Sequence, residues 1–257
     1  MMVGPHRPSF LTGLSIVLLT SLLVGTANAM NCVIERDVDA LMLRTQIRPL
    51  PAGHMTVFPA ALFSVLGACF AVIGIAVLSN ALTACLGALG YLSYVVLYTP
   101  LKQKTPWALI VGAVPGAIPP LMGWTASNGT LGAQGLALFS LLFVWQIPHF
   151  LAIALCERFE YARAGIKVLP LTHGLPVTYR AIRISAVLTG FAMLAPYTTG
   201  IAGHAYGIVA SLLALHFIGV TWFSPKSDAM LRPWAVRIFR TSVIDLTILM
   251  VLLVLDH

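Results

Sequence analysis

Charged side chains are scarce in this chain. Only 9% of its 257 residues are Asp, Glu, Lys or Arg, whereas 59% are hydrophobic. A soluble domain carries about 25% charged residues, so this composition cannot cover a water-facing surface. The sequence therefore excludes an ordinary soluble enzyme and predicts an all-α membrane protein, because helices satisfy every backbone polar group inside lipid.

Cysteine is also scarce and shows no metal-ligand spacing. The four cysteines lie in or at the ends of apolar runs: Cys32, Cys69, Cys85 and Cys156. We expect them to be buried small hydrophobic side chains, and they indicate nothing about the redox compartment.

Apolar runs of about 20 residues, the length that crosses a bilayer as a helix, occur eight times. They cover residues 10–31, 57–78, 81–101, 107–125, 132–155, 181–201, 205–223 and 240–256. Short connections containing Gly and Pro favour one domain over residues 1–257, a polytopic transmembrane helical bundle. Ala27-Asn28-Ala29 resembles a secretory cleavage site, but the first run is long and continues into a polar motif, which favours a retained span.

The basic residues are concentrated on one face. If the spans alternate, 14 of the 15 Lys and Arg side chains share that face. They are Arg36, Arg44, Arg48, Lys102, Lys104, Arg158, Arg163, Lys167, Arg180, Arg183, Lys226, Arg232, Arg237 and Arg240. The positive-inside rule makes this face cytoplasmic, or its organellar equivalent. The net charge of +7 therefore reflects topology and does not indicate a nucleic-acid partner.

Arg7 is the fifteenth basic residue, and alternation places it on the opposite face. A basic residue on the wrong side of the first span is the pattern expected if a further span precedes Met1. We interpret the chain as lacking that first span.

An acidic motif follows the first apolar run. Asn31, Glu35 and Asp39 are spaced i, i+4, i+8, which places them on one helix face, whereas Asp37 points nearly opposite. A second group, His149, Glu157 and Glu160, follows the fifth run. Its spacing of i, i+8, i+11 also predicts a shared face.

Carboxylates at a helix C-terminus oppose the helix dipole by about 0.3–1 kcal/mol each. A bound Mg²⁺ reverses that effect, and Mg²⁺ commonly bridges carboxylates to substrate phosphates. Neighbouring cations that suit phosphate recognition are Arg44, Arg48, Lys102, Lys104, Arg163 and Lys167. The alternative interpretation is a set of solvated, mutually paired loop charges.

The first motif, Asn31-x-x-x-Glu35-x-x-x-Asp39, resembles the N-x-x-x-D-x-x-x-D motif of the UbiA superfamily of intramembrane prenyltransferases. Five further segments look like the superfamily branch of protoheme IX farnesyltransferases, or haem O synthases. They run from Leu41 to Pro51, Tyr98 to Pro106, Pro119 to Trp124, Trp145 to Phe150 and Glu160 to Pro170. The resemblance covers about residues 25–175, in the family's order.

The resemblance implies Mg²⁺-dependent farnesyl transfer from farnesyl diphosphate to a vinyl group of haem b. It implies catalytic roles for Asn31, Glu35, Asp39 and Glu160, with the three carboxylates of this set as metal ligands. It further implies diphosphate contacts from Arg44, Arg48, Lys102, Lys104 and Arg163, and acceptor-side roles for Tyr98 and His149.

The same resemblance implies a place in the bacterial cell (inner) membrane, with the active site on the cytoplasmic side. It also implies that the product is handed to a haem A synthase or a terminal oxidase.

Three departures from the family pattern keep alternatives open: the second acidic motif, Asp245 and the number of spans. Glu160 stands where the family has Asp, Phe159 where it has another acid, and Asp245 where it has an aromatic or apolar residue. The family also has nine spans, the first bearing a Lys-Pro-Arg element. The alternatives are a prenyltransferase with an aromatic or quinone-precursor acceptor, an inactive truncated copy, and a transporter. Acids concentrated at one interface disfavour a transporter, which places polar groups near the midplane.

Overall fold

The computed structural model describes residues 9–257, so Arg7 and the expectation based on it lie outside the described residues. Within this range the chain forms helices and loops without a β-strand. Eight helical segments are long and apolar enough to cross a membrane. The predicted fold class, a polytopic transmembrane helical bundle, is confirmed.

The helices follow one another with short connections. Five of the long helices are uninterrupted in the first three-quarters of the chain: α1 (Phe10–Ile34), α3 (Val57–Leu78), α6 (Ala108–Asn128), α7 (Gly132–Cys156) and α10 (Gly174–Thr198). The third span is composite, built from α4 (Ala81–Leu92), a π-helical segment η1 (Ser93–Tyr98) and α5 (Thr99–Leu101). The last two spans are α11 (His204–Trp222) and α12 (Asp228–Leu255), and the short helices are α2 (Arg36–Asp39), α8 (Arg158–Arg163) and α9 (Leu169–Thr172).

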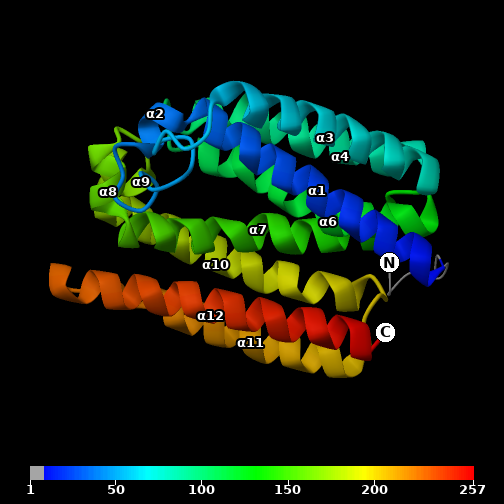
Figure 1. Cartoon of the computed structure of the whole chain (residues 1–257). Coiled ribbons are helices and arrows are strands. Elements are labelled where there is room, and N and C mark those ends of the chain that lie inside the picture. The colour runs from blue at the N-terminus through cyan, green and yellow to red at the C-terminus, as the bar shows by residue number, and fades with distance from the viewer. Residues whose placement is uncertain (1–8) are drawn as a thin grey trace.

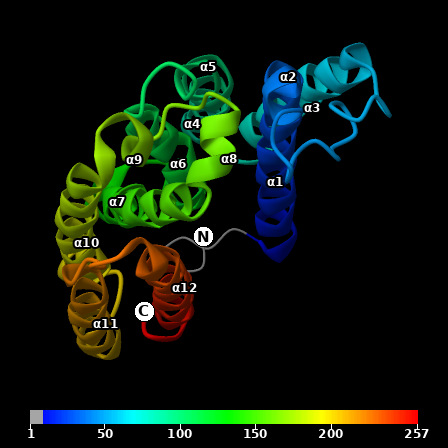
Figure 2. The ribbon, with the colours of Figure 1, turned by 90° about the vertical axis from the view of Figure 1, so that its left-hand side faces the viewer.

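The long helices lie side by side along one axis, with α2, α8 and α9 together at one end (Figure 1). Viewed from that end they follow an arc, with α1 and α3 at one extreme and α11 and α12 at the other (Figure 2). Packing follows chain order from α3 through α4, α6, α7 and α10 to α11 and α12. α12 also packs against α7, so α7 is in contact with both halves of the arc.

Small residues allow α1 and α3 to approach closely. The buried positions of α3 include Ala60, Ser64, Ala68 and Ala71, the small side chains that membrane helices use at their contacts. The Ser64 hydroxyl donates a hydrogen bond to the backbone oxygen of Thr26 in α1, at 2.7 Å. This pair of helices positions the acidic end of α1.

Two predicted span boundaries are wrong at their basic ends. Helix α10 begins at Gly174 instead of residue 181, and α12 begins at Asp228 instead of residue 240. An apolar run marks only the part of a helix inside lipid. Arg and Lys are good helix formers, so both helices continue beyond the bilayer through their basic turns. The other six spans agree with the predicted bounds within three residues.

The basic segments lie at one end of the bundle, as predicted. Three contacts join them: Leu43 N to Glu160 Oε2 at 2.7 Å, Lys167 N to Lys102 O at 3.3 Å, and Arg158 Nη2 to Asp228 Oδ2 at 3.2 Å. The segments after the first, third, fifth and seventh spans therefore meet at the end that carries α2 and α8 (Figure 1).

The expectation of buried cysteines is wrong. Cys69 and Cys85 are exposed, and Cys32 and Cys156 are half-buried. A membrane helix is apolar on its lipid-facing side as well as in its packed interface. Apolar neighbours in the sequence therefore do not show which of the two faces a cysteine occupies.

Candidate active site

The acidic motif forms one buried face at the end of α1. The helix is interrupted at Glu35, yet the i to i+4 bonds continue from Glu35 N to Asn31 O at 2.9 Å and from Asp39 N to Glu35 O at 2.7 Å. Asn31, Glu35 and Asp39 are all buried. The Asp37 side chain is 86% exposed and pairs with Arg36. The predicted geometry of this motif is confirmed.

Glu35 is 2% exposed and is held from two neighbouring elements. Its Oε2 accepts a hydrogen bond from Asn31 Nδ2 at 3.0 Å and lies 2.5 Å from Lys102 Nζ, just after the third span. The same Asn31 amide also donates to Thr99 Oγ1 at 3.2 Å. Glu35 Oε1 is buried and has no hydrogen-bond partner within residues 9–257. One buried carboxylate oxygen of this motif is thus left without a partner.

Asp39 is paired with a cation from the following loop. Arg48 Nη1 lies 2.7 Å from Asp39 Oδ2 and 3.7 Å from Cys32 Sγ. Burial disfavours the charged guanidinium, but the hydrogen bond and the charge of Asp39 outweigh it and raise the pKa of Arg48 above its usual value. The two buried carboxylates of this motif are therefore each matched by one cation.

The predicted second face is not formed. Helix α7 ends at Cys156 and α8 begins at Arg158, with i to i+4 bonds continuing across Glu157. The contacts nevertheless separate the residues: Glu160 points to the loop after α2, where it accepts from Leu43 N at 2.7 Å, and it pairs with Arg163 at 3.3 Å. His149 faces α12 instead, with its Nδ1 2.8 Å from Ser242 Oγ.

Among residues 9–257, no group of three or more His, Cys, Asp or Glu side chains is close enough to hold a metal ion alone. The structure unites Asn31, Glu35 and Asp39 but leaves Glu160 on α8, bound to the loop after α2. Carboxylate and amide oxygens, one of them unpartnered, fit Mg²⁺, which is usually held by one or two carboxylates together with water and phosphate.

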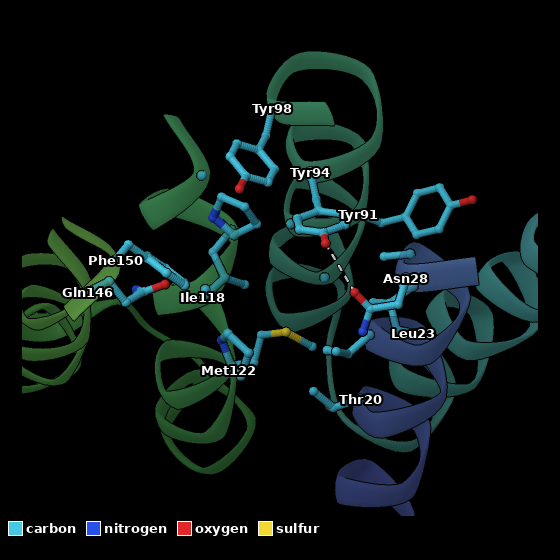
Figure 3. Close-up of a pocket in the computed structure, with 18 of the residues that line it drawn as sticks. Thr20, Leu23, Asn28, Tyr91, Tyr94, Tyr98, Ile118, Met122, Gln146 and Phe150 are labelled. Atoms are coloured by element: carbon cyan, nitrogen blue, oxygen red, sulfur yellow. Dashed lines mark hydrogen bonds between the residues drawn. The ribbon is translucent and has the colours of Figure 1, made fainter. Parts of the chain in front are cut away.

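A cavity of about 380 Å³ lies beside the motif, between α1, α4, η1, α6 and α7 (Figure 3). Its wall is mostly apolar. It is lined by Thr20, Leu23, Val24, Ala27, Asn28, Gly87, Gly90, Tyr91, Tyr94, Tyr98, Leu109, Gly112, Pro115, Gly116, Ile118, Pro119, Met122, Gln146 and Phe150. Tyr94 donates a hydrogen bond to Asn28 Oδ1 at 3.1 Å, which reduces the polarity of the wall.

Two tyrosines of η1 connect the cavity to the acidic motif. The rings of Tyr94 and Tyr98 lie 5.4 Å apart, and π-helical turns are frequent at functional sites. Lys102, the partner of Glu35, has its Nζ 5.7 Å from the centre of the Tyr98 ring. Gly112 makes room for that ring, because a Cβ there would lie 2.5 Å from it.

A smaller cavity of about 110 Å³ continues towards the basic loops. It shares Tyr98, Leu109 and Phe150 with the larger cavity and adds Lys102, Lys167 and Tyr161 among its lining residues. Burial raises the pKa of the Tyr161 phenol above its usual value, so it remains a neutral hydrogen-bond donor. The larger cavity therefore meets, at Tyr98, a second cavity whose lining includes two lysines.

The remaining predicted cations lie at the same end but outside both cavities. Arg44, Lys104 and Arg163 are exposed, and Arg163 pairs with Glu160. Of the two acceptor-side candidates, Tyr98 lines both cavities, whereas His149 lines neither of them. Sequence reasoning missed Asn28, Tyr94, Phe150 and Tyr161, whose only signal is that polar and aromatic residues gather near one end of the spans.

Comparison with known proteins places these features in context. A profile of the UbiA prenyltransferase family matches residues 1–243. The chain is 44% identical over 239 residues to the protoheme IX farnesyltransferase of Anaeromyxobacter sp. (strain Fw109-5), covering 93% of this chain and 80% of the relative. It is 40% identical over 260 residues to the protein of the same name from Myxococcus xanthus (strain DK1622), covering 100% and 87%.

Solved structures show the same fold at low sequence identity. A structure of digeranylgeranylglyceryl phosphate synthase superposes with a TM-score of 0.75 at 18% identity, covering 97% of this chain and 87% of the other. A UbiA homolog from Archaeoglobus fulgidus, bound to DMAPP and Mg²⁺, gives a TM-score of 0.69 at 17% identity, covering 96% and 90%.

Proposed function

This chain belongs to the UbiA prenyltransferase family, and on that premise we propose that it transfers a farnesyl group from farnesyl diphosphate to a vinyl group of haem b, producing haem O. It is an integral, multi-pass membrane prenyltransferase. The observation that carries the proposal is one juxtaposition: a buried, cation-paired acidic motif adjoins a mostly apolar cavity of about 380 Å³.

The diphosphate is bound at the basic end of that cavity. Lys102 and Arg48 already lie at Glu35 and Asp39, and both can turn to phosphate oxygens through charge-assisted hydrogen bonds. Lys167 and Tyr161 line the smaller cavity beside Lys102. The predicted contacts Arg44, Lys104 and Arg163 lie on the same surface and steer the anion towards it.

Asn31, Glu35 and Asp39 would hold Mg²⁺ through their oxygens, with the unpartnered Glu35 Oε1 as the first of these. When bound there, the ion would supply positive charge that stabilises the departing diphosphate. Glu160 is proposed to reach the same anion from the opposite side. Its carboxylate now accepts a hydrogen bond from Leu43 N at 2.7 Å, so this role requires that hydrogen bond to break.

The farnesyl tail occupies the apolar cavity and keeps water from the reacting carbon. Tyr94, Tyr98 and Phe150 line its wall, and aromatic faces stabilise a nearby cation. Tyr98 lies where the larger cavity meets the smaller one that Lys102 and Lys167 line. It is therefore placed beside the first carbon of the farnesyl chain.

The reaction breaks the bond between the first farnesyl carbon and the diphosphate oxygen, and the electron pair leaves with the diphosphate. The vinyl π electrons of haem b then form the new carbon–carbon bond. Water adds to the resulting cation beside the macrocycle and releases a proton, which leaves a hydroxyl group. The residues around the anion lower the barrier by stabilising charge as it develops, usually the largest catalytic term.

The basic end of the bundle faces the cytoplasm, and the membrane is the bacterial cell (inner) membrane. The clustering of Lys and Arg at that end and the positive-inside rule support this orientation. The product leaves through the lipid phase to a haem A synthase or a terminal oxidase.

The test is an assay of membranes containing this chain with haem b, farnesyl diphosphate and Mg²⁺, with the haems resolved by mass. Haem O is expected with Mg²⁺ and absent when the metal is chelated. Membranes carrying the Glu35→Gln variant are the matched control. A parallel assay replaces haem b with an aromatic acceptor. Haem b returned unchanged by the wild-type chain, with the aromatic acceptor prenylated instead, contradicts the proposed acceptor.

A further inference from the structure

The large cavity is elongated along the helix axes. On α6 its lining runs from Leu109 to Met122, a distance of about 20 Å at 1.5 Å per residue. Tyr98, at the basic end, lies at one extreme, and Met122 and Thr20 lie at the other (Figure 3). Because the diphosphate is anchored at the basic end, a prenyl chain extends towards Met122.

Three helices converge at the deep end. A Cβ placed on Gly87 of α4 would lie 3.0 Å from Leu23 Cδ2 of α1 and 3.1 Å from Met122 Cε of α6. Both of these side chains line the cavity, and they approach one another in Figure 3. The absence of a side chain at Gly87 therefore allows Leu23 and Met122 to pack closely against α4 at this constriction.

The cavity continues past the constriction on the α1 side, whereas Met122 blocks it on the α6 side. Thr20, about one turn beyond Leu23 on α1, still belongs to the lining, so space continues past the constriction. Met122 is fully buried, and its unbranched thioether is the most adaptable of the apolar side chains. A chain that is one isoprene unit longer must displace it, whereas a chain that ends before it makes no such demand.

We propose, on the basis of the prenyl transfer proposed above, that the constriction formed by Gly87, Leu23 and Met122 selects the length of the prenyl chain. A side chain at position 87 would push the ends of Leu23 and Met122 into the cavity that they line. Met122 limits anything longer. One methylene in an apolar pocket changes substrate discrimination about 10–200-fold, so single substitutions here are large enough to change the preferred chain.

Two variants change the constriction in opposite directions. Gly87→Ala narrows it, and the new methyl group meets only the flexible ends of Leu23 and Met122, which can shift by a few tenths of an ångström. Met122→Ala widens it. The matched controls are Gly25→Ala, where a Cβ has nothing within 4 Å, and Leu89→Ala, at a position that is 53% exposed.

The experiment gives membranes of each variant equal amounts of geranyl, farnesyl and geranylgeranyl diphosphate with haem b and Mg²⁺. The amount of each prenylated haem is then measured after the products are resolved by mass. Met122→Ala is expected to raise the ratio of geranylgeranyl to farnesyl product by at least about tenfold. Gly87→Ala is expected to shift the ratio of geranyl to farnesyl product in favour of geranyl, and both controls to keep the wild-type ratios.

A binding measurement separates this inference from the proposed function. Unreactive thiolodiphosphate analogues of the three chain lengths are added to each purified protein, and the shift in melting temperature is recorded without haem. Wild-type protein that prenylates no haem but is stabilised most by the farnesyl analogue contradicts the acceptor and supports the chain-length role. Variants with wild-type product ratios and wild-type analogue preference overturn the inference.

Discussion

Lys102 Nζ lies 2.5 Å from Glu35 Oε2, an ion pair that joins the end of the third span to the end of the first. The Glu35 side chain is 3% exposed and that of Lys102 is 22% exposed. The pair therefore compensates a carboxylate that would otherwise be buried without a cation. The pair also holds the Lys102 ammonium group next to the position where the leaving diphosphate is proposed to bind.

Removing the metal-facing charge tests the role of the acidic motif. Glu35→Gln and Asp39→Asn keep the size of each side chain but lose the negative oxygens that a divalent ion requires. Each variant is expected to abolish Mg²⁺-dependent turnover while the protein still inserts and folds. Asp37→Asn is the matched control, because that side chain is 86% exposed and points away. Wild-type turnover in both Glu35→Gln and Asp39→Asn would rule out this metal site.

Removing the cation of the pair tests its contribution to stability. Removing one partner of a buried ion pair costs about 3–5 kcal/mol of folding stability. Because Lys102 is partly exposed, Lys102→Met is expected to cost an amount at or below the lower end of that range. The double variant Lys102→Met with Glu35→Gln is expected to recover the melting temperature in detergent but not turnover. A double variant no more stable than Lys102→Met alone contradicts the coupling.

Two substitutions of Glu160 separate its contact with the loop from its proposed role at the anion. Glu160→Ala removes the acceptor for Leu43 N, so faster hydrogen exchange is expected across residues 40–56. Glu160→Gln keeps an acceptor oxygen and is expected to leave that exchange unchanged. Turnover is expected to fall in both variants. Full turnover in Glu160→Gln would restrict Glu160 to holding the loop.

A close approach at Gly112 tests the placement of Tyr98. A Cβ at this position would lie 2.5 Å from the ring of Tyr98, and overpacking of this kind costs about 1–3 kcal/mol. Gly112→Ala is expected to lower both the melting temperature and turnover, because the ring must leave the junction of the two cavities. Gly25→Ala, which meets open space, serves as the control. Equal melting temperatures for the two variants would contradict the contact.

The sequence by itself determined the features that depend on local periodicity and on the bilayer. Lipid thickness fixes the length of an apolar run, so six of the spans were predicted within three residues. Helical spacing placed Asn31, Glu35 and Asp39 on one face and Asp37 on the other, and the structure agrees. The basic residues predicted which loops meet, because their charge excludes them from lipid.

Tertiary structure alone decided which distant side chains meet. Glu160 contacts Leu43 in the loop after α2, whereas His149 contacts Ser242 of α12, although helical spacing had placed both on one face. The cavity takes its lining from four spans, and its constriction exists because Gly87 has no side chain where Leu23 and Met122 approach. These contacts join residues far apart in the chain, and a pattern with a period of one helical turn carries no information about them.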